Sequence, residues 1–236
     1  MPPDSRRLLD DAALERSSVV ANNAMNRGRG LSGPNSYAKE LGFDPYQRLV
    51  ETYCAATAST VIWIDVCCGS GRALLAAEER FAGELPDAGV RLVGIDLVDY
   101  YLAPPRTSRL RFFTTQATTW RPDGPADLVT CVHGLHYIGD KLALLAAMAS
   151  WLAPHGTFAA HFDPDTIRHA DGSSAARQVL AVLRAADMTY DRRRHRISSR
   201  GPRSICFPVT YLGADDRDGP GYTGQPAVAS YYEWWA

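Results

Sequence analysis

Short apolar runs recur along the middle of the chain, and the first of them opens a regular local pattern. Residues 61–64 are all apolar and run into Asp65, and a turn of small residues follows at 67–71. Residues 73–79 are then rich in alanine, leucine and glutamate, which favour a helix. A continuous apolar run of this length is typical of a strand buried on both faces of a sheet. The pattern therefore predicts a strand, a tight turn and a helix in succession.

The same kind of strand is predicted four more times further along the chain. The later runs cover residues 91–96, 110–115, 126–132 and 159–163. Residues 140–152 separate the last two runs and carry leucine, methionine and alanine at helical spacing. Strands that alternate with helices predict an α/β fold, with a mostly parallel sheet and helices on both faces.

The two ends of the chain add further elements to this sheet. Helices are predicted at residues 10–20, 36–41 and 44–58, so the chain begins with a helical prelude. After the last apolar run, residues 173–188 are predicted to form another helix. That helix is followed by two segments of strand character, and these define the C-terminal part of the predicted sheet.

The two C-terminal strands are predicted at residues 194–199 and 204–212. Gly201 and Pro202 lie between them and are strong turn signals. We therefore expect an antiparallel C-terminal hairpin at the end of the parallel sheet.

The turn after the first strand is suited to a bound cofactor. Gly69 and Gly71 have no Cβ, so a ligand can approach the backbone closely. A dinucleotide site needs a third glycine where this chain has Leu74. A phosphate-binding P-loop needs a Gly-Lys-Ser/Thr ending, which is absent from this turn. What remains is an acid at the strand end followed by Gly-x-Gly.

This remaining pattern resembles motif I of the class I S-adenosylmethionine (SAM)-dependent methyltransferases. Asp65, Gly69 and Gly71 match the motif, and Cys67 stands where the family usually has its first glycine. Asp96 ends the second apolar run, where the family places an acid that accepts the ribose hydroxyls. The resemblance implies a Rossmann-like sheet, with residues 1–60 as a helical lid and residues 61–236 as the SAM-binding domain.

Later segments extend the resemblance as far as residue 163. Gln116 and Ala117 stand where the family often has Asp-Ala, and the amide oxygen of Gln116 can accept from the adenine amine. Residues 126–132 resemble motif IV, and residues 151–158 resemble the family's turn into its fifth strand. The resemblance thus implies SAM as cofactor, held by ten residues: Asp65, Cys67, Gly69, Ser70, Gly71, Asp96, Gln116, Ala117, Val132 and His133.

Three residues are candidates for catalysis. His133 follows the fourth strand, where the resemblance places the methyl group, and histidine titrates near neutral pH. A histidine that only binds backbone at a strand end remains the alternative interpretation. His161 lies at the end of the fifth strand and can point into the same pocket. Tyr37, in the prelude, can reach the SAM carboxylate or the acceptor.

Composition and charge limit the binding partners that this chain is expected to have. The formal net charge is −1, so no general attraction to nucleic acid or membranes is expected. The basic run at residues 192–196 indicates a solvated face, with RNA binding as the weaker alternative. The five cysteines contain no C-x-x-C pair, and no acidic ligand set follows the fourth strand. We therefore expect a reducing, cytoplasmic location, no metal site, and no nucleic-acid or membrane partner.

The C-terminal segment, residues 219–236, is rich in tyrosine and tryptophan. Such a segment is too apolar for a free tail, so it is expected to pack on the body, on a homodimer partner or at the pocket mouth.

The leading functional hypothesis is a SAM-dependent methyltransferase. It would methylate an oxygen or nitrogen of a small molecule, with secondary metabolism as the expected setting. Two alternatives remain open. One is an enzyme of the same fold that uses SAM for chemistry other than methylation. The other is a non-catalytic SAM-binding protein.

Overall fold

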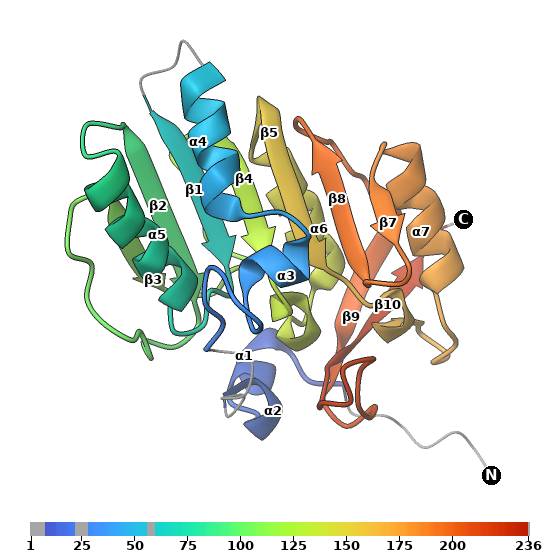
Figure 1. The fold of residues 1–236 in the computed structure, drawn as a ribbon. Coiled ribbons are helices and arrows are strands. Elements are labelled where there is room, and N and C mark those ends of the chain that lie inside the picture. The colour runs from blue at the N-terminus through green and yellow to red at the C-terminus, as the bar shows by residue number, and fades with distance from the viewer. Residues whose placement is uncertain (1–7, 22–27, 56–59, 236) are drawn as a thin grey trace.

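A seven-stranded sheet forms the centre of the protein (Figure 1). The computed structural model describes residues 8–21, 28–55 and 60–235. The strand order is β3-β2-β1-β4-β5-β8-β7. The strands are β1 (Val61–Val66), β2 (Val90–Asp96), β3 (Leu110–Thr114), β4 (Ala126–Cys131), β5 (Leu152–His161), β7 (Thr189–Asp191) and β8 (Arg196–Arg200). The first five run parallel, while β8 is antiparallel to β5 and to β7. The predicted fold class is confirmed.

Helices cover both faces of this sheet. In Figure 1, α4 and α5 lie in front of the strands and α6 lies behind them. Trp63 packs with the residues under α4 and α5, whereas its neighbour Ile64 packs with those under α6. This alternation follows from the two-residue repeat of a strand. The longer helices are α4 (Pro45–Ala55), α5 (Arg72–Glu84), α6 (Lys141–Ser150) and α7 (Ala176–Ala185).

The partner expected for the antiparallel hairpin is wrong. β8 pairs with β7, the strand before it, and residues 192–195 form the turn. The Asp191 side chain accepts the backbone N–H groups of Arg193 and Arg194, so the basic run is an exposed turn. In the described part of the chain, no hairpin strand follows Gly201; the N–H of Arg203 donates instead to the carbonyl of Ala149, at the end of α6.

The residues expected to complete the hairpin instead contribute to a second sheet, of order β6-β10-β9. Its strands are β6 (Ile167–His169), β9 (Val209–Asp215) and β10 (Ala229–Trp234). Tyr231 and Tyr232 in β10 are fully buried. Of the places proposed for the aromatic segment, the structure therefore has it on the body of the protein.

The N-terminal helices lie at the carboxyl end of the parallel strands, where β1 and β4 finish (Figure 1). The expected helix at 10–20 is two short ones, and a bond from the Ala13 N–H to Asp10 caps the first. Leu9 exchanges two backbone hydrogen bonds with Ala214 of β9, which ties this region to the second sheet. The short helices are α1 (Asp11–Glu15), α2 (Ser18–Ala21), α3 (Tyr37–Leu41), η1 (Gly134–Tyr137) and η2 (Pro164–Thr166).

Helix α3 is held firmly at both ends. Ser36 caps its first turn by accepting the Lys39 N–H, and Gly42 ends it in the left-handed conformation (φ 74°). A Cβ at Gly42 would lie 2.8 Å from the guanidinium of Arg196 in β8. This close approach places α3 against the end of the central sheet. Among the helices of the described residues, none has the length and apolar character that crossing a membrane requires.

Candidate functional site

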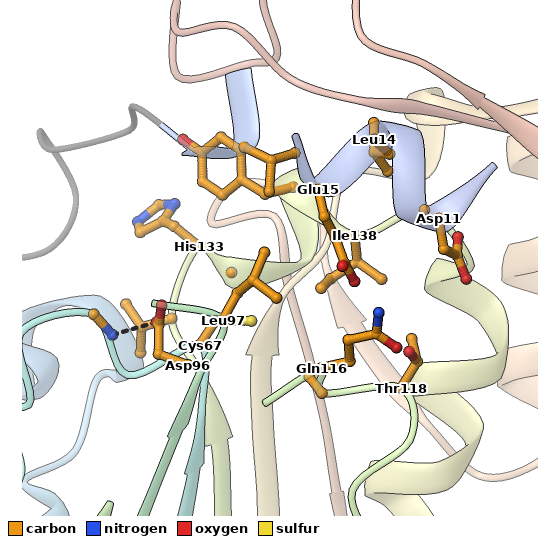
Figure 2. Close-up of a pocket in the computed structure, with 17 residues that line it drawn as sticks. Asp11, Leu14, Glu15, Cys67, Asp96, Leu97, Gln116, Thr118, His133 and Ile138 are labelled. Atoms are coloured by element: carbon orange, nitrogen blue, oxygen red, sulfur yellow. Dashed lines mark hydrogen bonds between the residues drawn. The ribbon is translucent and has the colours of Figure 1, made fainter. Parts of the chain in front are cut away.

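A pocket opens where the strand order reverses, between β1 and β4. Such a switch point is the usual ligand site of an open α/β sheet. Cys67, Asp96 and His133 line it from the strand ends, while Leu14 and Glu15 of α1 cover it from the other side (Figure 2). The pocket therefore lies between the sheet and the N-terminal helices.

The turn after β1 has the geometry of a backbone cradle. Cys67 (φ 57°), Gly69 (φ 59°) and Gly71 (φ 68°) are all in the left-handed region, which is costly for cysteine and not for glycine. The neighbouring Gly134 is equally constrained, since a Cβ there would lie 2.3 Å from the Cβ of Cys67. The tight packing keeps side chains out of this corner of the pocket.

Asp96 joins this turn to the end of β2. One carboxylate oxygen accepts the N–H of Gly69 at 2.8 Å (Figure 2), and the other accepts the N–H of Val98 at 3.3 Å. Asp96 also lines the pocket, so the carboxylate is fixed at its wall. A carboxylate oxygen can accept more than one hydrogen bond, so a carboxylate at this wall could also accept a ligand hydroxyl.

Seven of the ten residues expected to hold the cofactor line the pocket. The seven are Cys67, Gly69, Asp96, Gln116, Ala117, Val132 and His133. The structure places Asp65, Ser70 and Gly71 outside the lining. Gly71 instead lies against a ring, because a Cβ there would approach Phe112 to 2.4 Å.

Asp65 serves the interior of the protein. It is fully buried, and its two oxygens accept hydrogen bonds from the hydroxyls of Tyr37 (2.8 Å) and Thr130 (2.6 Å). Burial raises the pKa of Asp65 to about 7, an effect these two hydrogen bonds partly oppose. The three side chains tie α3 to β1 and β4. Tyr37, a predicted catalytic residue, is thus buried beside Asp65 and does not line the pocket.

The two predicted histidines lie together beside the pocket. The rings of His133 and His161 stack with centroids 4.0 Å apart and planes 8° from parallel. Oε2 of Glu40 lies 3.2 Å from Nε2 of His133 and 3.4 Å from Nε2 of His161. The Tyr222 hydroxyl lies 3.3 Å from Nδ1 of His133. His133 lines the pocket, and His161 packs behind it.

The electrostatics of this cluster follow from burial and from the shared carboxylate. The hydrogen bond from His133 lowers the pKa of Glu40 to about 2, although burial opposes the shift. Burial lowers the pKa of His161 to about 3, and it also lowers the pKa of His136. Among the described residues, Nδ1 of His161 has no hydrogen-bond partner. His161 is therefore a neutral imidazole beside the Glu40 carboxylate.

Glu40 and Tyr222 were not singled out in the sequence. Glu40 is 93 residues from His133, and no local motif marks it. Tyr222 belongs to the aromatic segment for which the pocket mouth was one expected position, and its ring also stacks on His195 at 3.8 Å.

A sheet in this order, with its pocket at the β1–β4 switch and an acid after β2, has the arrangement of a class I SAM-dependent methyltransferase. Residues 36–204 match the family model described as a methyltransferase domain. The chain therefore belongs to this methyltransferase family, as the sequence predicted. No protein with a curated description gives a significant match.

Solved structures give distant matches. SAM-bound CalS10, an amino pentose methyltransferase from Micromonospora echinaspora, is 26% identical with a TM-score of 0.39, over 61% of this chain and 55% of that one. The N-methyltransferase NodS from Bradyrhizobium japonicum, with S-adenosylhomocysteine, is 18% identical with a TM-score of 0.41, over 67% of this chain and 85% of that one. The chain thus spans about half the length of CalS10.

Proposed function

We propose that this protein transfers a methyl group from SAM to an oxygen or nitrogen atom of a small molecule. One observation carries the proposal: the family's cofactor positions converge on a covered pocket that the His133 ring also lines. The α1 cover favours an acceptor small enough to fit beneath it.

The residues around the pocket suit the parts of SAM. Asp96 would accept the ribose hydroxyls, because its carboxylate is already fixed by two backbone N–H groups. The left-handed turn at Cys67 and Gly69 would take the methionine portion, since it leaves open backbone at the pocket wall. Gln116 would accept from the adenine amine through its amide oxygen. When bound, SAM supplies a methyl group that its sulfonium has already activated.

The acceptor side would be formed by the histidine cluster. His133 is the residue of the cluster that reaches the pocket, and Glu40 fixes its ring from behind. We propose that His133 orients the acceptor and promotes the loss of its proton. His161 supports the His133 ring by stacking against it.

The setting of the enzyme is part of the same proposal. All five cysteines lie within the described residues as free thiols, which supports a reducing, cytoplasmic location. A contact between two copies of the chain through the aromatic C-terminal segment belongs to the same proposal, with the 61% exposed Trp235 available for it.

Titration of SAM into the protein by calorimetry tests the cofactor site. We expect Asp96→Asn to weaken SAM binding by at least about tenfold, because it removes a charged acceptor. Asp99→Asn, at an exposed position nearby, is the matched control and should bind SAM normally. Failure of the native chain to bind SAM would overturn the proposal.

Labelled SAM and a panel of small hydroxyl and amine compounds then test the reaction. Methylated product is the expected result. SAM consumption without methylated product would favour the non-methylating enzyme, and binding without turnover would favour a non-catalytic protein.

A further inference from the structure

We propose that Glu40, His133 and His161 bind a divalent transition metal ion of the zinc type, with an open coordination position toward the pocket. The inference rests on the proposed function, because the ion would hold the acceptor of that reaction. It departs from the expectation of no metal site, which considered only ligands close together in the sequence.

The spacing of the three side chains fits a metal ion. Oε2 of Glu40 is 3.2 Å from Nε2 of His133 and 3.4 Å from Nε2 of His161, and all three atoms lie within 4.8 Å of one another. Ligand atoms about 2.1 Å from zinc, at angles between about 90° and 109°, are separated by about 3.0–3.4 Å. Both carboxylate distances lie in or close to this range.

The ligands come from three well-ordered parts of the fold. Glu40 lies in the capped helix α3, His133 is the residue before η1 and lies two residues after β4, and His161 ends β5. Both histidines are buried, and the Glu40 side chain is 27% exposed. Elements of this kind fix the backbone positions of the three ligands, so only side chains need to move when the ion binds.

The ligands also have the outer partners that a metal site requires. Nδ1 of His133 lies 3.3 Å from the Tyr222 hydroxyl. When Nε2 holds the ion, Nδ1 carries the hydrogen and can donate a hydrogen bond to the hydroxyl oxygen of Tyr222. Oε1 of Glu40 accepts a hydrogen bond from Arg29 at 3.4 Å, which leaves Oε2 for the ion. Partners of this kind fix the tautomer and orientation of metal ligands.

One ring must turn for the ion to bind. The planes of His133 and His161 are 8° from parallel, so an ion cannot lie in both planes in this arrangement. His161 is the ring that fewer hydrogen bonds hold, since its Nδ1 has no hydrogen-bond partner among the described residues, whereas Nδ1 of His133 contacts Tyr222. Turning it breaks the 3.4 Å contact with Glu40, and the metal bonds replace that contact.

The three ligand side chains determine which metal ion the site would prefer and which methyl acceptor that ion could bind. Two imidazoles and one carboxylate suit zinc or iron(II), whereas magnesium and calcium prefer oxygen ligands. Three protein ligands leave at least one position open, and His133 sets that position beside the pocket. The matching acceptor is a small molecule with a hydroxyl group. Its oxygen would bind the ion, and its proton would leave to solvent because coordination lowers the hydroxyl pKa.

Metal binding to the full chain is the test. Chelator-treated protein is titrated with Zn²⁺ by calorimetry and with Co²⁺ by visible absorption. We expect one equivalent to bind per chain. His161→Ala and Glu40→Gln should weaken binding by at least about a hundredfold, beyond the usual effect of losing an outer partner. His155→Ala and Glu51→Gln change exposed residues of the same types and should bind like the native chain.

SAM titrations of the same samples separate this inference from the proposed function. Normal SAM binding by all four variants shows that they are folded. The metal inference is overturned if SAM binds but neither ion does, or if His161→Ala and Glu40→Gln retain native metal affinity. Full methyl transfer by metal-free protein would also overturn it, since His133 would then act without the ion. Loss of SAM binding by the native chain counts against the proposed function.

Discussion

Nε2 of His133 lies 3.2 Å from Oε2 of Glu40, so a carboxylate on the N-terminal helix α3 fixes a ring that lines the pocket. The pair spans 93 residues of sequence and joins the N-terminal segment to the end of β4. The orientation of His133 therefore depends on the placement of α3 as well as on the central sheet.

Replacing His133 separates chemistry from cofactor binding. We expect His133→Ala to lower kcat by at least about a hundredfold, because the acceptor loses the group that orients it and promotes proton loss. The SAM Kd should change by only a few fold, since Asp96 and the glycine turn remain. Single-turnover kinetics and calorimetry measure the two effects, with His155→Ala as control. An unchanged kcat would remove His133 from the reaction.

Asp65 should make stability depend on pH. Its pKa is about 7 in the folded protein, against an ordinary value of 3.8, so the folded state keeps a proton that the unfolded state loses. The free energy of unfolding should therefore fall as pH rises from about 4 to 7. Asp65→Asn keeps one acceptor oxygen, places an amide donor beside the second hydroxyl, and should flatten this slope because it cannot ionise. Urea unfolding at pH 5 and pH 8 measures it, and an equal slope in both proteins would contradict the assignment.

Lys141 should also make stability depend on pH, but with the opposite sign to Asp65 and at higher pH. It is buried, and its ammonium donates to the Val228 carbonyl and to Ser230. Burial lowers its pKa to about 7 from 10.5, so the unfolded state binds more protons between these values. The free energy of unfolding should rise with pH across this window. Lys141→Met should remove the rise, which unfolding at pH 7 and pH 9.5 would show.

Gly134 should tolerate no side chain. A Cβ there would lie 2.3 Å from the Cβ of Cys67 and 2.8 Å from Sγ of Cys131. We expect Gly134→Ala to destabilise the protein by about 1–3 kcal/mol through overpacking and to weaken SAM binding. Gly124→Ala is the matched control, because a Cβ there would meet nothing within 4 Å. Thermal unfolding and SAM titration distinguish them, and similar behaviour of the two variants would refute the packing argument.

Local sequence patterns predicted the parallel strands well. The apolar runs became β1 to β5 because strands buried on both faces leave a continuous signature. The hairpin partner of β8 could not be predicted in this way. The segment after β8 makes contacts with residues far away in the sequence, such as the hydrogen bond from Arg203 to Ala149, and no local pattern marks them.

The candidate site also contains residues that local patterns predict and residues that only long-range packing brings together. Residues at strand ends, such as Asp96 and His133, were predictable because parallel strands bring their carboxyl ends to one edge. Glu40 was not predictable, since it reaches the pocket histidines only because α3 packs against the end of the sheet. The acid of the glycine motif was expected at the cofactor, yet Asp65 binds Tyr37 and Thr130 in the interior.

The backbone pairing of Leu9 with Ala214 has a consequence for ligand exchange. The helix that roofs the pocket, α1, begins two residues after Leu9, and its Leu14 packs with Ala214 and Val228. These contacts attach α1 to the second sheet, whereas the opposite wall of the pocket belongs to the central sheet. The entry and release of a ligand would then depend on contacts between the N-terminal helix α1 and the C-terminal part of the chain.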